Sequence, residues 1–154
     1  MENRTQFKQA YDKAIELLSR RTHTAEELRR KLLRRKIADP AVVEDVIAKL
    51  KELRFLNDAD AARFYLESLI RYKSFGYFGL LQKLLLKGVA KSAAGELLDE
   101  LLDLDTEAAI ARKLLGKQAK SKQPGKQRAA AMLMRKGFRS QTIAKVLPDL
   151  EGGL

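Results

Sequence analysis

Hydrophobic residues recur every three or four positions along most of the chain, which is the spacing of one face of an α-helix. In the first such segment Phe7, Ala10, Ala14 and Leu17 fall along one stripe. No segment alternates apolar and polar residues as a half-buried strand does. The pattern therefore predicts an all-α chain of about nine helices.

One helical pattern occurs three times, at 28–37, 80–89 and 129–138. In each copy an apolar residue recurs four positions later, and the helix ends in a basic residue, a Gly or Lys, and an apolar residue. A period of about fifty residues is typical of stacked repeats that bury their apolar faces against their neighbours. We expect an elongated array of three tandem three-helix repeats at 1–53, 54–103 and 104–149, with a flexible tail at 150–154.

Several residues indicate where individual helices begin and end. Thr24 and Glu27 have the spacing of a capping box, in which each side chain accepts a hydrogen bond from a free backbone N–H group. We expect Asp58 and Ser92 to cap later helices. Gly88 suits the left-handed turn that commonly follows a helix.

The chain is strongly basic, with a formal net charge of +11. Residues 1–53 carry 13 basic and 9 acidic side chains, residues 54–103 carry 7 of each, and residues 104–154 carry 11 and 4. Both ends are therefore positive and the middle is neutral. This distribution favours a polyanionic partner at the outer repeats, because cations near phosphates displace condensed counterions.

Composition also bounds the location and the chemistry. Cysteine is absent, so disulfides and thiol chemistry are excluded. No run approaches the ~20 apolar residues that span a bilayer, and the first residues lack the apolar core of a signal peptide. We expect a cytoplasmic protein without a membrane partner.

Basic side chains gather in the first and third repeats. We expect both clusters to contact phosphates or acidic side chains, although a solvated face and a solubilising linker are the alternatives. No sequence-specific nucleic-acid motif accompanies them. The candidate residues are Arg20, Arg21, Arg29, Arg30, Lys31, Arg34, Arg35 and Lys36, followed by Lys113, Lys117, Lys120, Lys122, Lys126, Arg128, Arg135, Lys136 and Arg139.

Other candidate chemistry is sparse. The only histidine, His23, precedes a helix cap and is expected to be a turn residue. The acidic stripe of Asp99 and its neighbours is expected to be a solvated face. With no nucleophile–base pair and no metal-ligand spacing, we expect neither an enzyme nor a cofactor. Tyr77 and Phe78, beside glycines in the neutral repeat, are the expected exposed protein contact, with packing between repeats as the alternative for the aromatic residues of this repeat.

Short motifs occur in order along nearly the whole chain. The first repeat carries the arginine pair Arg20-Arg21, then His23-Thr24, Glu27-Leu28 and Lys31-Leu32. The second carries 56–58, Gly76 and the stretch 84–89 that ends in Lys-Gly-Val, and the third carries 135–138. In these motifs the chain resembles the RecX family. The first repeat departs from the family in having Lys36 where a Gly is common, and 77–79 lacks the expected Pro and basic residues.

This resemblance implies a curved three-repeat array that binds RecA recombinase filaments on DNA. It implies inhibition or tuning of filament assembly, ATP hydrolysis and strand exchange, with single- or double-stranded DNA held by the basic end repeats. The protein is then a monomer that leaves catalysis to its partner. The alternative function is non-sequence-specific DNA binding without a recombinase.

Overall fold

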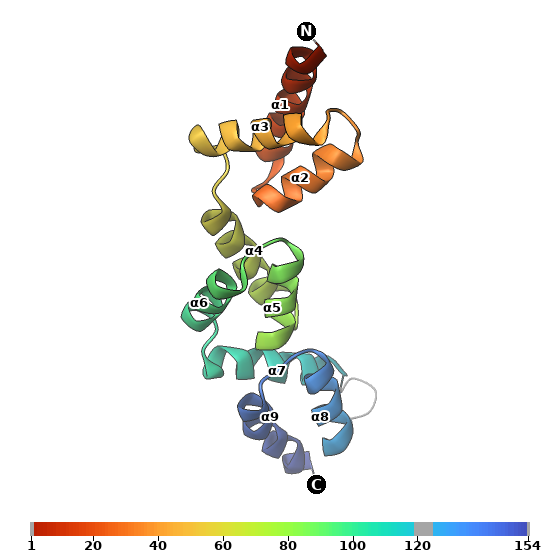
Figure 1. The fold of residues 1–154 in the computed structure, drawn as a ribbon. Coiled ribbons are helices and arrows are strands. Elements are labelled where there is room, and N and C mark those ends of the chain that lie inside the picture. Colours follow the sequence, from red (N-terminus) through yellow and green to blue (C-terminus); the bar gives the residue numbers. More distant parts are fainter. Residues whose placement is uncertain (1, 119–124, 154) are drawn as a thin grey trace. The chain divides into compact units, whose positions relative to one another are not determined.

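The computed structural model describes residues 2–118 and 125–153, and over these ranges it holds nine α-helices, one 3-10 helix and no strand (Figure 1). This confirms the all-α prediction. The helices are α1 (Glu2–Arg20), α2 (Ala25–Arg34), α3 (Pro40–Glu52), α4 (Asp58–Tyr72), α5 (Tyr77–Leu86), α6 (Lys91–Leu101), α7 (Leu104–Gln118), α8 (Lys126–Arg135) and α9 (Ser140–Val146), followed by η1 (Leu147–Gly153).

The chain forms two compact units. Unit 1 contains the residues up to 64 together with 86–89, and unit 2 contains 65–85 together with the residues from 90 onward. The division falls inside α4 and assigns the turn after α5 to unit 1. The three-repeat boundaries and the flexible tail stay predictions, and η1 covers most of the segment expected as tail.

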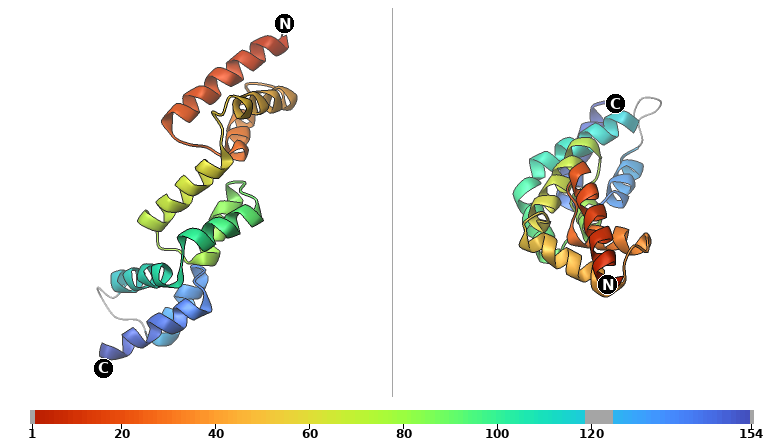
Figure 2. Two further views of the ribbon diagram at one scale, coloured as in Figure 1. Left: turned by 90° about the vertical axis from the view of Figure 1, so that its left-hand side faces the viewer. Right: turned by 90° about the horizontal axis from the view of Figure 1, so that it is seen from above.

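In unit 1, α1 packs against α2 and α3, and α2 also packs against α3 (Figures 1 and 2). Leu28 and Leu32 of α2 are fully buried between these helices, as the helical spacing predicts. Each buried aliphatic side chain contributes about 1.5–3 kcal/mol relative to exposure. The other core residues are Ala10, Ala14, Leu17, Ala25, Val43, Val46, Ile47, Leu50 and Leu56.

In unit 2, α7 packs against α9, and α8 packs against α9 (Figure 2). Leu80 and Leu84 of α5 and Leu133 of α8 are fully buried. They occupy the repeat positions of Leu28 and Leu32 in α2. The repeated pattern of the sequence is therefore the buried face of the middle helix in each repeat.

The helix starts follow the expectations in part. Thr24 and Glu27 form the predicted capping box. Because α4 begins at Asp58, the capping residue is Asn57, whose side-chain oxygen accepts the Asp60 N–H (3.1 Å). The Asp58 carboxylate instead accepts the Ala25 N–H at the start of α2 (2.7 Å). Ser92 does not cap α6, because the helix already begins at Lys91. The residue in extended backbone before the helix is Ala90, whose side chain makes no capping hydrogen bond.

A joint in unit 1 seats the start of α2 on the turn after α5. The Thr24 hydroxyl donates to the Lys87 carbonyl (2.6 Å), and the Lys87 ammonium lies 3.2 Å from the Glu27 carboxylate. Gly88 has a φ of +88°, and a Cβ there would lie 2.3 Å from the Glu26 Cβ. Glycine is therefore needed both for the left-handed backbone and for the close approach.

A joint in unit 2 repeats this arrangement with the start of α5 and the turn after α8. The Gly76 N–H donates to the Lys136 carbonyl (3.0 Å), and the Phe78 N–H donates to the Gly137 carbonyl (2.8 Å). Gly137 has a φ of +84°, and a Cβ there would lie 2.0 Å from the Gly79 nitrogen. A helix start thus donates to carbonyls of the next repeat in both joints, through the Thr24 hydroxyl in unit 1 and through backbone N–H groups in unit 2.

The unit 1 joint also depends on buried polar side chains. Glu27 accepts hydrogen bonds from the Arg21 guanidinium (2.9 Å), the Lys87 ammonium and the Thr24 N–H (3.3 Å). Burial alone would raise the pKa of Glu27, but these hydrogen bonds lower it overall. The carboxylate therefore stays ionised and holds the turn and both helices together.

His23 lies in the turn between α1 and α2 and is only 2% exposed. Its Nδ1–H donates to the Arg21 carbonyl (3.0 Å), and its Nε2 accepts from the Lys31 ammonium (2.8 Å). This geometry requires a neutral imidazole. Burial lowers the pKa of His23, and the charges of Arg21 and Lys31 lower it further. The hydrogen bond to the Arg21 carbonyl and the charge of Glu27 oppose this shift but do not reverse it.

Replacing Gly88 tests the joint. We expect Gly88→Ala to lower the free energy of unfolding by about 2 kcal/mol, because it adds a Cβ at positive φ against Glu26. Gly95→Ala is the matched control: nothing lies within 4 Å of its Cβ position inside α6. It should raise stability by up to about 1 kcal/mol. Urea denaturation measures the free energy of unfolding of both variants. Equal changes in the two would contradict the requirement for glycine at this joint.

Lowering the pH tests the buried histidine. As the pH falls through the ordinary His pKa of 6.5, the unfolded chain takes up a proton that the folded chain resists. The free energy of unfolding should therefore fall between about pH 7 and pH 5, and fall less in His23→Gln. NMR should place the titration midpoint of this single histidine below 6.5. A midpoint above that value would refute the neutral buried imidazole.

Candidate functional site

Three exposed cations mark the end of α2 and the turn that follows it. Arg34 and Lys36 make no side-chain hydrogen bond or ion pair within the described part of the chain. Arg35 is also exposed, and its charge adds to the effects of Lys13 and Arg20 that lower the pKa of Glu16. Since Leu28 and Leu32 bury the opposite face of α2, these cations face solvent.

The fold gives internal partners to the other five predicted cations of the first repeat. Glu26, one turn earlier on α2, pairs with both Arg29 and Arg30, and Glu44 on α3 pairs with Arg29. The hydrogen bond from Arg29 is the largest cause of the lowered pKa of Glu44. The complete pairs are Arg20 with Glu16, Arg21 with Glu27, Arg29 with Glu26 and Glu44, Arg30 with Glu26 and the Leu86 carbonyl, and Lys31 with His23.

The basic residues of the third repeat lie on α7, on α8 and in the turn after α8. Arg135 and Lys136 are exposed at the end of α8, and the Lys136 ammonium lies 5.1 Å from the centre of the Phe75 ring. Lys113 and Lys117 are exposed on α7, and Lys126 and Arg128 are exposed in the first turn of α8. Lys120 and Lys122 lie outside the described residues.

The exposed cations of the first and third repeats occupy the same positions of the repeat. Arg34 and Arg35 follow the buried Leu32, and Arg135 and Lys136 follow the buried Leu133. In the middle repeat the corresponding residues are Leu86 and Lys87, and Lys87 is bound to Glu27. The cationic positions are therefore left open in the outer repeats, as the charge distribution along the sequence indicates.

Arg139 belongs to a buried network around Glu107 that the sequence reasoning missed. Glu107 is fully buried and accepts hydrogen bonds from the Tyr77 N–H (2.7 Å), the Arg139 N–H (3.1 Å), the Arg139 Nε–H (2.8 Å) and the Thr142 hydroxyl. Burial alone would raise its pKa, but these donors lower it overall. One signal was available: Glu107 falls on the apolar stripe of α7, one turn before Ala111.

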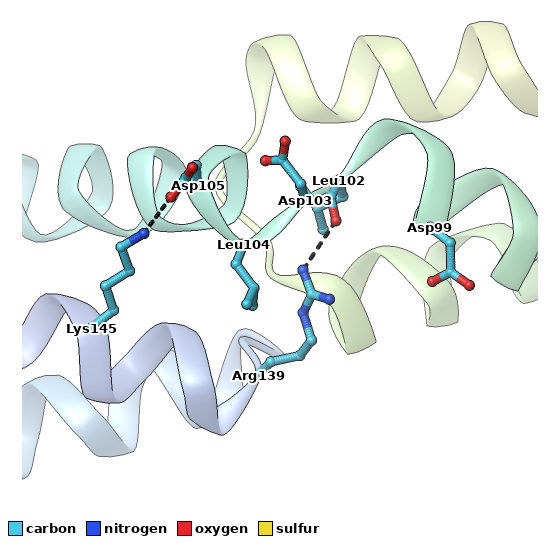
Figure 3. Close-up of a pocket in the computed structure, with 7 residues that line it drawn as sticks. All are labelled: Asp99, Leu102, Asp103, Leu104, Asp105, Arg139 and Lys145. Atoms are coloured by element: carbon cyan, nitrogen blue, oxygen red, sulfur yellow. Dashed lines mark hydrogen bonds and ion pairs between the residues drawn. The ribbon is translucent and has the colours of Figure 1, made fainter.

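A hollow of about 530 Å³ lies beside this network (Figure 3). Asp99, Asp103 and Asp105 contribute three carboxylates to its lining. Arg139 donates to the Leu102 carbonyl (3.1 Å) across it, and Lys145 pairs with Asp105. Its cations are thus already paired, so it does not suit a phosphate. Neither these carboxylates nor any other group of three or more His, Cys, Asp or Glu side chains among the described residues is placed to hold a metal ion.

Tyr77 and Phe78 differ in exposure. The Tyr77 hydroxyl donates to Asp99 (3.1 Å), and the Arg139 guanidinium lies 4.7 Å from the centre of its ring, so the side chain is half-buried. Phe78 is 56% exposed and lies edge-on to Tyr77. Phe78 is therefore the aromatic of this pair that presents a large apolar surface.

No helix in the described ranges combines the length and the apolar composition needed to cross a bilayer. Two surface features of those ranges are the exposed cations and the exposed side chain of Phe78. Neither constitutes a catalytic arrangement, since neither combines a nucleophile with a base.

Family models match both ends of the chain. The first three-helix domain of RecX matches residues 10–50, and the third three-helix domain matches residues 105–147. Regulatory protein RecX of Prosthecochloris aestuarii is 33% identical over 146 residues, which cover 93% of this chain and 94% of that protein.

Some curated relatives are longer. Regulatory protein RecX of Lactococcus lactis subsp. cremoris (strain MG1363) is 31% identical over 153 residues, but these cover 56% of that protein. The corresponding protein of Bacillus subtilis is 30% identical, also with 56% covered. The chain thus spans about half the length of these relatives.

Two solved structures share the fold. The crystal structure of RecX from Lactobacillus salivarius matches with a TM-score of 0.78 at 21% identity, covering 95% of this chain and 97% of that one. A crystal structure of regulatory protein RecX matches with a TM-score of 0.81 at 24% identity, covering 94% of this chain and 73% of that one. With two matched domains and a relative aligned over nearly its full length, this chain belongs to the RecX family of regulatory proteins.

Proposed function

We propose that this protein binds RecA recombinase filaments on DNA and inhibits or tunes their assembly, ATP hydrolysis and strand exchange. Membership of a family of regulatory proteins supports the regulatory part of this proposal. Catalysis belongs to the recombinase. We further expect the protein to act as a cytoplasmic monomer.

The observation that carries the proposal is the set of exposed cations at the end of α2, of which Arg34 and Lys36 have no internal partner within the described residues. The positions of Arg34 and Arg35 are repeated by the exposed Arg135 and Lys136 at the end of α8. Internal carboxylates neutralise the neighbouring Arg29 and Arg30, whereas Arg34 and Lys36 keep their full charge for a partner. Guanidinium and ammonium groups of this kind bind phosphate oxygens and carboxylates. A filament of protein on DNA offers both.

The exposed cations suit contacts with the phosphate backbone. Base reading in a groove requires side chains on an element that enters the groove, supported by contacts that fix its register. Here the free cations lie at a helix end and in the adjacent turn, where they reach phosphates without inserting a helix. We therefore propose that DNA sequence plays no part in binding.

Charge reversal on α2 tests the proposal. We expect Arg34→Glu, Lys36→Glu to raise the protein concentration that half-maximally changes RecA ATP hydrolysis on single-stranded DNA by about tenfold, since two contacts of roughly 0.7 kcal/mol each are lost. The measurement is a titration at fixed recombinase and DNA. Arg30 is unsuitable for this test because it bonds to Glu26 and the Leu86 carbonyl.

The matched control is Lys73→Glu, Lys91→Glu, which changes the net charge equally at two exposed lysines elsewhere. It should shift the titration by less than about twofold, as expected for distant surface charges. If both variants shift the half-maximal concentration equally, the effect depends on net charge and not on Arg34 and Lys36. Wild-type protein that leaves hydrolysis and filament length unchanged, but binds bare DNA tightly, would favour the DNA-binding alternative.

Salt dependence separates the two functions further. If Arg128 and Arg135 contact phosphates, Arg128→Gln, Arg135→Gln should reduce the slope of log K against log salt on bare duplex DNA by about 2. Fluorescence anisotropy at several salt concentrations measures this slope. A weakened variant with an unchanged slope would show that these residues do not contact phosphates.

A further inference from the structure

An apolar groove of about 520 Å³ opens in unit 2 beside the joint of α5 and α8. Phe138 and Ile143 are almost fully buried and form its floor. Phe78 and Met134 line it on the α5 and α8 sides. The lining is completed by Gly137, Ser140, Ala144 and Leu147. Its volume lies within the ~300–1,000 Å³ of small-ligand pockets.

Two large apolar side chains of this groove face water. Phe78 is 56% exposed and Met134 is 69% exposed. Removing apolar surface from water is favourable, so a partner that covers both side chains gains affinity. The hydrogen bond from the Phe78 N–H to the Gly137 carbonyl fixes the first of them at the groove. Methionine is flexible and adapts to different apolar shapes.

The charges around the groove indicate what can cover it. Its lining contains no carboxylate. Arg135 and Lys136, both exposed, lie in the chain between the lining residues Met134 and Gly137. Glu107 neutralises Arg139 and Asp105 neutralises Lys145, so the excess charge is that of Arg135 and Lys136. An occupant with apolar side chains flanked by carboxylates matches both features.

We infer that this groove binds an amphipathic helix of a protein subunit of the filament, with apolar side chains in the groove and carboxylates facing Arg135 and Lys136. The inference rests on the proposed function, because the filament supplies the helix. It assigns protein contact to the groove, whereas Arg34 and Lys36 bind anions without an apolar component. Helices bind grooves of this kind through residues spaced i, i+3, i+4 and i+7.

A synthetic helical peptide tests the chemistry of the groove directly. It carries leucine at i, i+3, i+4 and i+7, glutamate at the flanking positions and a fluorophore; a second peptide replaces every glutamate with lysine. We expect the acidic peptide to bind the full-length protein at least about tenfold more tightly than the basic one. Equal affinities, or no binding of either peptide, would overturn the inference.

Variants at Met134 then locate the binding. Met134→Glu should lower the affinity for both the acidic peptide and the RecA–DNA filament at least about tenfold, because it places a charge in the groove. Met134→Leu should change these affinities by less than about twofold. Leu86→Glu is the matched control, since Leu86 is 61% exposed and lies outside the groove. Circular dichroism checks that each variant folds.

The outcomes distinguish this inference from the proposed function. If the wild-type protein and Met134→Glu bind the filament equally well, the role assigned to the groove is wrong and the proposed function is unaffected. Wild-type protein that binds the acidic peptide but not the filament overturns the proposed function and leaves the chemistry of the groove. If Met134→Glu loses as much affinity for bare DNA as it loses for the filament, the surface binds nucleic acid and the inference is overturned.

Discussion

The seating of a helix start on a left-handed turn of the next repeat is the constraint on which the rest of the structure depends. A three-helix repeat buries too little apolar surface to be stable alone. The joint adds polar pairing to that small core, because free N–H groups and side chains at one helix start meet free carbonyls after another helix. In both joints a glycine permits the approach.

The joints also decide which cations remain available. Glu27 and Glu107 are buried carboxylates, and each needs donors to stay ionised away from water. Arg21 and Lys87 supply them in unit 1, and Arg139 supplies them in unit 2. These residues stabilise the fold and have less freedom to bind a partner. The cations that face solvent lie where no buried carboxylate requires them.

Local signals predicted the fold well and the pairing of charges poorly. The helical stripes, the capping box at Thr24 and the turn at Gly88 depend on neighbours within a few residues, so the sequence displays them directly. The partners of Arg29 and Glu107 depend on tertiary contacts 15 and 32 residues away. Asp58 shows the same limit. The sequence around it predicts that it caps its own helix, but its carboxylate accepts the N–H of Ala25 at the start of another helix.

Lys36 links the fold to the charged surface. The turn after α2 has the same left-handed backbone as the turns at Gly88 and Gly137, with a φ of +53°, although a lysine costs about 1 kcal/mol more than glycine there. Gly88 and Gly137 lie under the helix start of another repeat, so any Cβ would clash. Within the described residues no helix start covers the turn at Lys36, so a side chain fits. Where the joint is absent, the position can carry a cation, and this cation is exposed for a partner.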